Sequence, residues 1–251
     1  MDHDFKILID TSTERGRDFR RGRAEKSIQD RITRTPVSVK SSDGSIEQLG
    51  TSVSFPRKAE IFYENQPAEY LYKVISGTVR TYKSLSDGRR KIGAFYMPGD
   101  FFGLETGCHA FSAEAITDAE VLAIKRDGLV ALAAKDNKVA SRLWSLASRE
   151  LERVHRQILL LVMSAEERVA GFLCEMADRF STEDGIELPM SRQDIADYLG
   201  LTIETVSRTL THLERAAVIA LPTSRRVVLH SRSALTQSIR ETGSVRTQPI
   251  A

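Results

Sequence analysis

The spacing of apolar residues changes twice along the chain, and each change predicts a different kind of structure. From about residue 37 to 125 the chain consists of short apolar-rich runs separated by turn residues. Examples are the runs Tyr70–Ile75, Thr78–Tyr82 and Lys91–Met97, with an Asp-Gly turn at residues 87–88. Many short runs of this kind are typical of antiparallel strands joined by hairpins. The pattern predicts an antiparallel β-roll.

A helical period follows from residue 127 to 163. Apolar residues there recur at alternating steps of three and four, which is the spacing of the a and d positions of a coiled coil. They are Trp144, Ala147, Leu151, Val154, Ile158 and Leu161. A stripe this narrow favours a coiled coil with a second copy of the chain, although packing of the helix on its own domain remains the alternative. A coiled coil would place the two copies of the C-terminal part of the chain in a two-fold arrangement.

Two short helices joined by a sharp turn are predicted after residue 190. Ser191 has the chemistry of an N-cap with Asp194 three residues on, and Thr202 has that of a second N-cap. Gly200 lies between the helices, where positive φ is favoured, and Ala196 lets the helices cross closely. One buried side is formed by Ile195, Leu199, Leu201, Val206 and Leu210. We interpret this pattern as a helix-turn-helix, whose second helix enters the DNA major groove, rather than as an ordinary helical hairpin.

Burial of that side leaves Glu204, Ser207 and Arg208 on the opposite face of the second helix. Arginine can donate two hydrogen bonds to guanine, and a carboxylate can accept one from cytosine. We therefore expect these three residues to contact base edges. Because Glu204 and Arg208 are four residues apart, a surface ion pair between them is the alternative.

Candidate phosphate contacts surround this helix. Ser191, Arg192, Thr202 and Thr205 lie near helix N-termini, where amides and hydroxyls favour anions. Farther on, two β runs flank a basic tip that carries Arg225 and Arg226, which is typical of a β-hairpin wing. Residues 201–232 hold five Arg and two Glu, a local excess of three positive charges on a chain with net charge +2.

Composition excludes several other classes of protein. Lys+Arg 36 against Asp+Glu 34 gives no bulk charge for unspecific nucleic-acid binding. The two cysteines, Cys108 and Cys174, cannot form a four-thiolate metal site. The chain carries no secretion signal and no run long enough to cross a membrane, so we expect a cytoplasmic protein.

The fold class is therefore expected to be α+β with five segments. They are a mobile arm at 1–35, a β-roll at 36–126, a dimerisation helix at 127–163, a winged helix-turn-helix at 164–235 and a mobile tail at 236–251.

In this order of parts, residues 40–232 resemble the CRP/FNR family of bacterial transcription regulators. Within the second helix, Glu204-Thr205-Val206-Ser207-Arg208 matches the E-x-x-S-R pattern of the FNR and FixK branches, and residues 194–210 look closest to the FixK type. The resemblance implies a homodimer that reads a TTGA/TCAA-like palindrome in double-stranded DNA. It also implies activation through RNA polymerase and control of low-oxygen respiration or nitrogen-fixation genes.

The chain departs from the nucleotide-binding members of that family. Gly99-Asp100-Phe101-Phe102-Gly103 resembles the start of their phosphate-binding cassette, but Leu104 and Phe111-Ser112-Ala113 stand where Glu and Arg-Ser-Ala are needed. Because phenylalanine cannot pair with a cyclic phosphate, we expect neither cyclic AMP binding nor any cofactor. The arm also lacks the cysteine cluster of oxygen-sensing members.

Two alternatives remain. The same DNA-binding dimer could be gated by an acidic small molecule in the β-roll. The roll could instead host cupin-like metal chemistry, which needs closely spaced His and Glu ligands. The histidines are scattered, and we expect no catalytic and no metal-binding residues; they are His3, His109, His155, His212 and His230.

Overall fold

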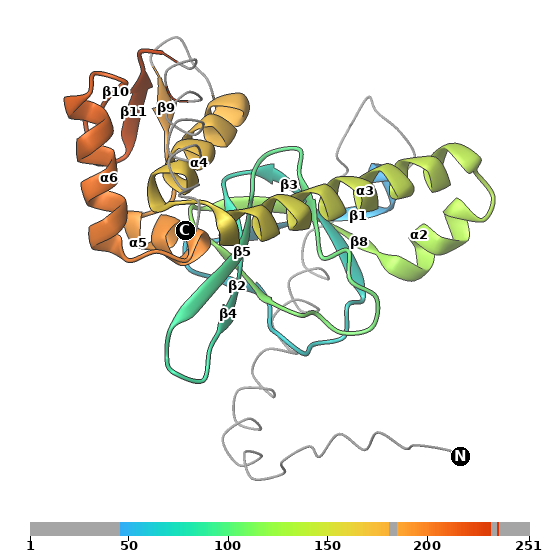
Figure 1. The fold of residues 1–251 in the computed structure, drawn as a ribbon. Coiled ribbons are helices and arrows are strands. Elements are labelled where there is room, and N and C mark those ends of the chain that lie inside the picture. Colours follow the sequence, from blue (N-terminus) through green and yellow to red (C-terminus); the bar gives the residue numbers. More distant parts are fainter. Residues whose placement is uncertain (1–45, 181–184, 232–234, 236–251) are drawn as a thin grey trace, which may run out of the picture.

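The N-terminal domain consists of two four-stranded antiparallel sheets (Figure 1). The computed structural model describes residues 46–180, 185–231 and 235. The expected arm, the expected tail and residues 36–45 of the expected roll lie outside these residues. One sheet has the order β1-β8-β3-β6 and the other β2-β7-β4-β5. After a short turn of helix η2 (Glu47–Leu49), the strands are β1 (Gly50–Phe55), β2 (Glu60–Phe62), β3 (Tyr70–Ser76), β4 (Val79–Ser84), β5 (Arg90–Tyr96), β6 (Phe101–Phe102), β7 (Ser112–Ala115) and β8 (Ala119–Lys125).

The core of this roll lies between the two sheets and is rich in aromatic rings. Phe62, Tyr72, Tyr96 and Phe102 pack together, with ring centroids of neighbouring pairs 5.1–6.0 Å apart. Over the first four residues of β4, buried residues alternate with partly exposed ones, as in a strand with one face in the core. The short runs read from the sequence therefore form the predicted antiparallel roll.

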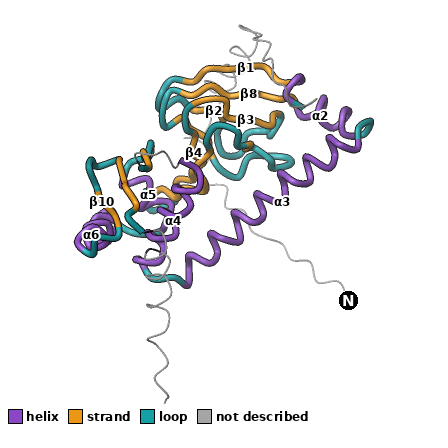
Figure 2. The backbone as a smooth tube through the Cα atoms, turned by 90° about the horizontal axis from the view of Figure 1, so that it is seen from above, coloured by secondary structure: helices purple, strands orange, loops and turns teal. Residues whose placement is uncertain are grey.

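The helical stretch 127–163 is not one helix. It divides into α2 (Arg126–Ala133), α3 (Asn137–Leu159) and the short 3₁₀ helix η3 (Leu160–Val162). The division has a local cause, because the Asp136 side chain accepts a hydrogen bond from the amide of Lys138 and so caps the start of α3. Figure 2 shows α3 running along one side of the roll toward the C-terminal domain.

The C-terminal domain combines three helices with a small sheet. The helices are α4 (Ala165–Phe180), α5 (Arg192–Leu199) and α6 (Ile203–Arg215). The strands are β9 (Ile186–Glu187), β10 (Ile219–Ala220) and β11 (Arg226–Leu229), in the order β10-β11-β9. This confirms the α+β fold class with a winged helix-turn-helix, and it adds β9, which the sequence pattern did not reveal.

The two domains share an apolar cluster. Ile92 and Phe95 of β5 are buried together with residues of α4, α5 and α6. The ring of Phe95 lies 5.3 Å from that of Tyr198 on α5. The outer face of the β2-β7-β4-β5 sheet therefore packs against the helix-turn-helix. No helix in the described part of the chain is long and apolar enough to cross a membrane.

Candidate nucleic-acid interface

The helix-turn-helix is built from local capping interactions. The Ser191 hydroxyl accepts from the amide of Asp194, and the Asp194 side chain accepts from the amide of Ser191, which is a complete capping box. Gly200 ends α5 with φ 67°, and Thr202 caps α6 by accepting from the amide of Thr205 at 3.2 Å. The expected caps and the expected turn residue are all confirmed. They fix where α6 begins.

One face of α6 is buried and the other is exposed. Val206, Leu210 and Leu213 are the buried residues of the helix. On the other face Glu204 and Arg208 are exposed, and Ser207 is half-buried. No ion pair joins Glu204 to Arg208 among the described residues. Hydrogen bonds from its own backbone amide and from Thr202 lower the pKa of Glu204, and the charge of Arg208 also helps to lower it. The lowered pKa favours the charged carboxylate as a hydrogen-bond acceptor.

A hollow of about 430 Å³ lies along the exposed side of α6. It is lined by Ser207, Arg208, Thr211, His212 and Arg215. His212 also lies 4.0 Å from Glu166 at the start of α4. Our sequence reasoning did not select Arg215 as a site residue, although its place seven residues after Arg208 puts it on the same face. This hollow extends the candidate DNA surface by a second arginine.

The candidate phosphate contacts do not form one group. Thr202 and Thr205 lie at the start of α6, just after the turn between the two helices, whereas Arg192 lies at the N-terminal end of α5. The Ser191 hydroxyl lies there too, but it donates to Asp194 Oδ2 at 2.8 Å, so it cannot donate to a phosphate while the capping box is intact. Arg225 and Arg226 are carried by the wing, where Thr223 Oγ1 accepts from both of their amides.

The apolar stripe of α3 faces away from the roll. Trp144 exposes 76% of its surface, and Leu151, Val154 and Ile158 are also exposed. Ala147 is exposed as well, whereas the side chain of Leu161 lies outside the described residues. The opposite face contributes Val139, Leu143 and Leu146 to the cluster under the helix. The stripe therefore does not pack on its own domain within the described chain.

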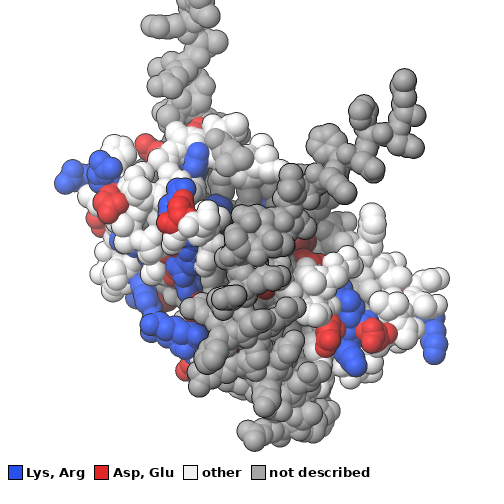
Figure 3. Space-filling model, turned by 90° about the horizontal axis from the view of Figure 1, so that it is seen from below, with Lys and Arg blue, Asp and Glu red and all other residues white. Residues whose placement is uncertain are grey.

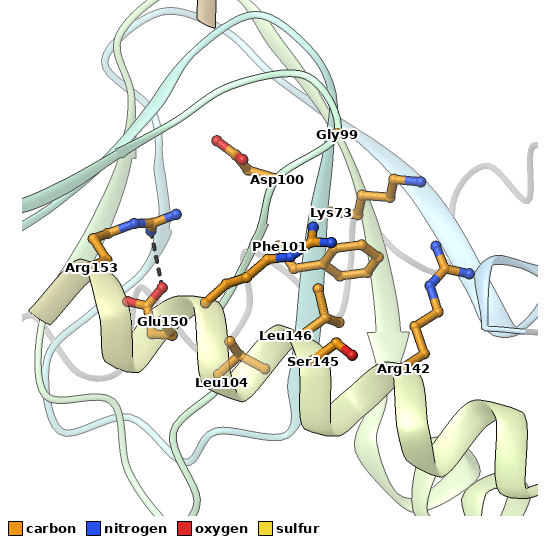
Figure 4. Close-up of a pocket in the computed structure, with 11 residues that line it drawn as sticks. Lys73, Gly99, Asp100, Phe101, Leu104, Arg142, Ser145, Leu146, Glu150 and Arg153 are labelled. Carbon is orange, nitrogen blue, oxygen red and sulfur yellow. Dashed lines mark ion pairs between the residues drawn. The ribbon is translucent and has the colours of Figure 1, made fainter. Parts of the chain in front are cut away.

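A pocket of about 520 Å³ separates part of α3 from the roll (Figure 4). Four basic side chains line it, and three of them are paired. Lys73 and Arg142 both bind Glu47, and Arg153 lies 3.0 Å from Glu150. The fourth, Arg149, is exposed. Of the three pairs, Arg142–Glu47 ties α3 to the roll, whereas Lys73–Glu47 lies within the roll and Arg153–Glu150 within α3.

Rings pack at the far end of the region that resembles a phosphate-binding cassette, whereas Gly99, Asp100, Phe101 and Leu104 at its start line the pocket beside α3. A Cβ on Gly93 would lie 3.0 Å from Phe111 Cε1, so the Phe111 ring covers this glycine. His109 is buried, stacks on Phe62 with centroids 3.6 Å apart, and lies 3.4 Å from Glu105. Cys108 is exposed and Cys174 packs at the edge of the C-terminal core. No group of three or more His, Cys, Asp or Glu suited to a metal occurs in the described residues, which leave out His3.

Comparison with known proteins agrees with this geometry. A model of the cyclic nucleotide-binding domain matches residues 52–136, and a model of the Crp-like helix-turn-helix domain matches residues 167–238. The nitrogen fixation regulation protein FixK of Azorhizobium caulinodans is 50% identical over 197 residues, which cover 76% of this chain and 79% of that protein. The transcriptional activatory protein AadR of Rhodopseudomonas palustris is 42% identical over 181 residues, 70% of this chain and 76% of that protein.

A solved structure extends the likeness to three dimensions. The structure of FixK2 from Bradyrhizobium japonicum superposes with a TM-score of 0.73 at 47% identity, and the match covers 75% of this chain and 96% of that one. The helix-turn-helix, the roll and the order of the parts are thus shared with regulators of transcription. The chain belongs to the CRP/FNR family of DNA-binding transcription regulators, within which it is similar to FixK.

Proposed function

We propose that the chain works as a homodimer whose two α6 helices read a TTGA/TCAA-like palindrome. Glu204, Ser207 and Arg208 are the residues that contact bases, because their face of α6 is open while the other face is buried. A second copy of the chain covers the exposed stripe of α3, whose a and d spacing suits a two-stranded coiled coil. The open face of α6 is the single observation that carries this proposal.

The phosphate contacts come from two directions. Arg192, Thr202 and Thr205 approach the backbone from the helix N-termini, and Arg225 and Arg226 approach from the wing. In this arrangement the Ser191 hydroxyl supports the cap of α5, and its contribution to phosphate binding comes through the N-terminal turn that it stabilises.

The regulatory role follows from the relatives. Because the relatives compared above are regulators, and FixK of Azorhizobium caulinodans is named for nitrogen fixation, we propose a FixK-type activator of low-oxygen respiration or nitrogen-fixation genes. It works in the cytoplasm, contacts RNA polymerase as the family resemblance implies, and catalyses no reaction. Phe111, which stands where a phosphate-pairing arginine would be needed, supports DNA binding without cyclic AMP.

Selection of binding sites from a random DNA pool tests this function. The expected product is a palindrome with TTGA and TCAA half-sites whose centres are about one helical turn apart. Enrichment of a single half-site, or of no sequence, would contradict the proposal.

A second candidate function is the same dimer gated by an acidic small molecule. The pocket between α3 and the roll favours it, because four basic side chains line the space. Melting curves with citrate, malonate and inorganic phosphate test this candidate, with Arg149→Gln as the matched variant. A rise in melting temperature that Arg149→Gln removes supports gating, and identical curves without and with the anions contradict it.

A further inference from the structure

A cluster of ion pairs joins the roll to the first helix of the helix-turn-helix. Arg80 on β4 donates to Asp194 Oδ1 at 2.6 Å, and Arg90 on β5 donates to the same oxygen at 2.6 Å. Arg90 Nε also donates to Asp197 at 2.9 Å. These groups are largely buried, with side-chain exposures of 11% for Arg80, 7% for Asp194 and 12% for Asp197. They are not pairs of solvated surface charges.

The contact holds α5 at both of its ends. At the N-terminal end, the carboxylate that accepts from the two arginines also caps the helix by accepting from Ser191. At the C-terminal end, Lys91 Nζ donates to the backbone carbonyl of Tyr198 at 2.6 Å. Three basic residues of one hairpin therefore fix both the position and the direction of α5.

The cluster leaves α6 free to reach DNA. In Figure 1 the β4–β5 hairpin lies beside α5, whereas α6 lies at the outer edge of the molecule. The exposed residues Glu204 and Arg208 are on that outer helix. In Figure 3, Lys and Arg side chains gather on the left half of the face, the side on which Figure 1 places α6 and the hairpin. The docked arrangement is therefore compatible with a bound DNA.

Binding to a palindrome requires a fixed distance between two helix-turn-helix units, which one unit alone does not set. Two α6 helices must be held at the spacing of two half-sites, roughly 34 Å apart. A C-terminal domain joined to α3 only through residues 160–164 would sample many orientations, and ordering it on DNA would cost affinity. A fixed contact with the roll removes that cost before DNA binds.

We propose that the β4–β5 hairpin is a built-in clamp, which holds α5 so that the two α6 helices of a dimer are set at the spacing of the palindrome. Arg80, Arg90 and Lys91 are then positioning residues for DNA binding, and no ligand is needed to align the domains. This inference rests on the proposed function, because it assumes a dimer on a two-part site.

The double variant Arg80→Gln, Arg90→Gln tests the clamp, because both changes lie on the roll and leave the capping box of α5 unaltered. Arg89→Gln is the control: it replaces an arginine of the same hairpin in the same way, although it removes one charge rather than two, and Arg89 is 79% exposed and pairs with Asp87 at the tip. Affinity is measured on the full palindrome, on one half-site, and on palindromes with one or two base pairs added or removed between half-sites.

The clamp predicts at least a tenfold loss of affinity for the palindrome, little change on one half-site, and a weaker preference for one spacing. Arg89→Gln should stay within twofold of the parent chain on every site. Equal losses on the palindrome and the half-site would mean damage to the helix-turn-helix itself and would overturn the clamp. A gain of affinity would overturn it too, because the docked state would then be the one that does not bind.

A double-mutant cycle adds an independent readout. Arg90→Gln and Asp197→Asn remove the two sides of one contact, so their effects on palindrome affinity should not add. Fully additive effects would contradict a role through this contact. If the parent chain selects no palindrome at all, the proposed function is contradicted. If the parent chain selects a palindrome and the variants bind it with unchanged affinity and spacing preference, the clamp alone is contradicted.

Discussion

Arg142 of α3 donates two hydrogen bonds to the carboxylate of Glu47, at 2.6 and 3.1 Å. Glu47 is almost fully buried and also accepts from Lys73. Burial alone would raise the pKa of Glu47, but the bonds from Lys73 and Arg142 outweigh burial and hold the pKa below its usual value. The carboxylate therefore stays charged and fixes one face of α3 to the roll, so that the apolar stripe faces outward.

The outward stripe predicts a dimer that charge can break. In the double variant Leu151→Glu, Val154→Glu, two copies of each carboxylate would meet in an apolar seam, where burying an unpaired charge costs several kcal/mol. Sedimentation should show a monomer, and DNA affinity should collapse. Val130→Glu is the control, because Val130 is also an exposed apolar residue, at 62%, but lies on α2 outside the stripe. An unchanged dimer in the double variant would rule out this seam.

Binding should not depend on cyclic nucleotides. Phe111 lies where a phosphate-pairing arginine would be needed, and its ring covers Gly93. Gel shifts with the selected palindrome should give the same affinity with and without cyclic AMP. A shift that appears only after cyclic AMP is added would contradict the interpretation of the roll.

Glu60 predicts a pH dependence of stability. Burial raises the pKa of Glu60 to about 7, although Tyr82 donates to it at 2.5 Å. A carboxyl with a raised pKa binds its proton more tightly in the folded state, so the stability should fall as pH rises from about 4.5 to about 7. Glu60→Gln keeps an acceptor for Tyr82 and removes the charge. We expect it to stabilise the chain by about 1–2 kcal/mol at pH 8, allowing for solvent screening, and much less at pH 5.

Urea unfolding at the two pH values measures this difference. Glu187→Gln serves as the control, because Glu187 is exposed. Equal stabilisation by Glu60→Gln at both pH values would contradict a raised pKa in the folded chain.

The turn of the helix-turn-helix should not tolerate a side chain. Gly200 has φ 67°, and a Cβ there would meet only Arg168 at an ordinary 3.8 Å, so Gly200→Ala should cost about 1–2 kcal/mol through backbone strain alone. Gly171→Ala, in the middle of α4 with open space around its Cβ, should instead stabilise the chain by about 0.5–1 kcal/mol. Thermal unfolding of both variants checks the opposite signs; two changes of the same sign would contradict the assigned turn.

The helix-turn-helix could be predicted from the sequence because its signals are local. The caps at Ser191 and Thr202, the glycine at 200 and the apolar spacing of α6 lie within about twenty residues of one another. The same holds for the hairpin turn at residues 87–88. The exposed apolar stripe of α3 could be predicted in the same way, because its residues follow one helical period along a single helix.

The contacts between domains could not be predicted in this way. Arg80 and Arg90 lie 114 and 104 residues from Asp194, and no spacing along the chain reveals that they meet. Strand β9 is only two residues long, so it leaves no alternating pattern, and its existence depends on pairing with β11. The sequence predicts that Asp194 caps α5, and this is confirmed, but its ion pairs with Arg80 and Arg90 depend on the fold.

Base recognition by α6 predicts a clear difference between Arg208 and the wing. If Arg208 reads guanine in each half-site, Arg208→Ala should cost about 1–3 kcal/mol per half-site and flatten the preference at that base pair. Glu204→Ala should relax the neighbouring position. A wing arginine that contacts phosphate should instead weaken binding to all sequences alike and lower the salt slope by about one.

The most direct measurement is therefore a set of binding titrations on a site library at two salt concentrations, for Arg208→Ala and Arg225→Ala side by side. The account predicts that Arg208→Ala loses base preference, whereas Arg225→Ala keeps the preference and has a salt slope lowered by about one. Full base preference in Arg208→Ala together with lost preference in Arg225→Ala would contradict the account, because the wing would then be the part that reads the sequence.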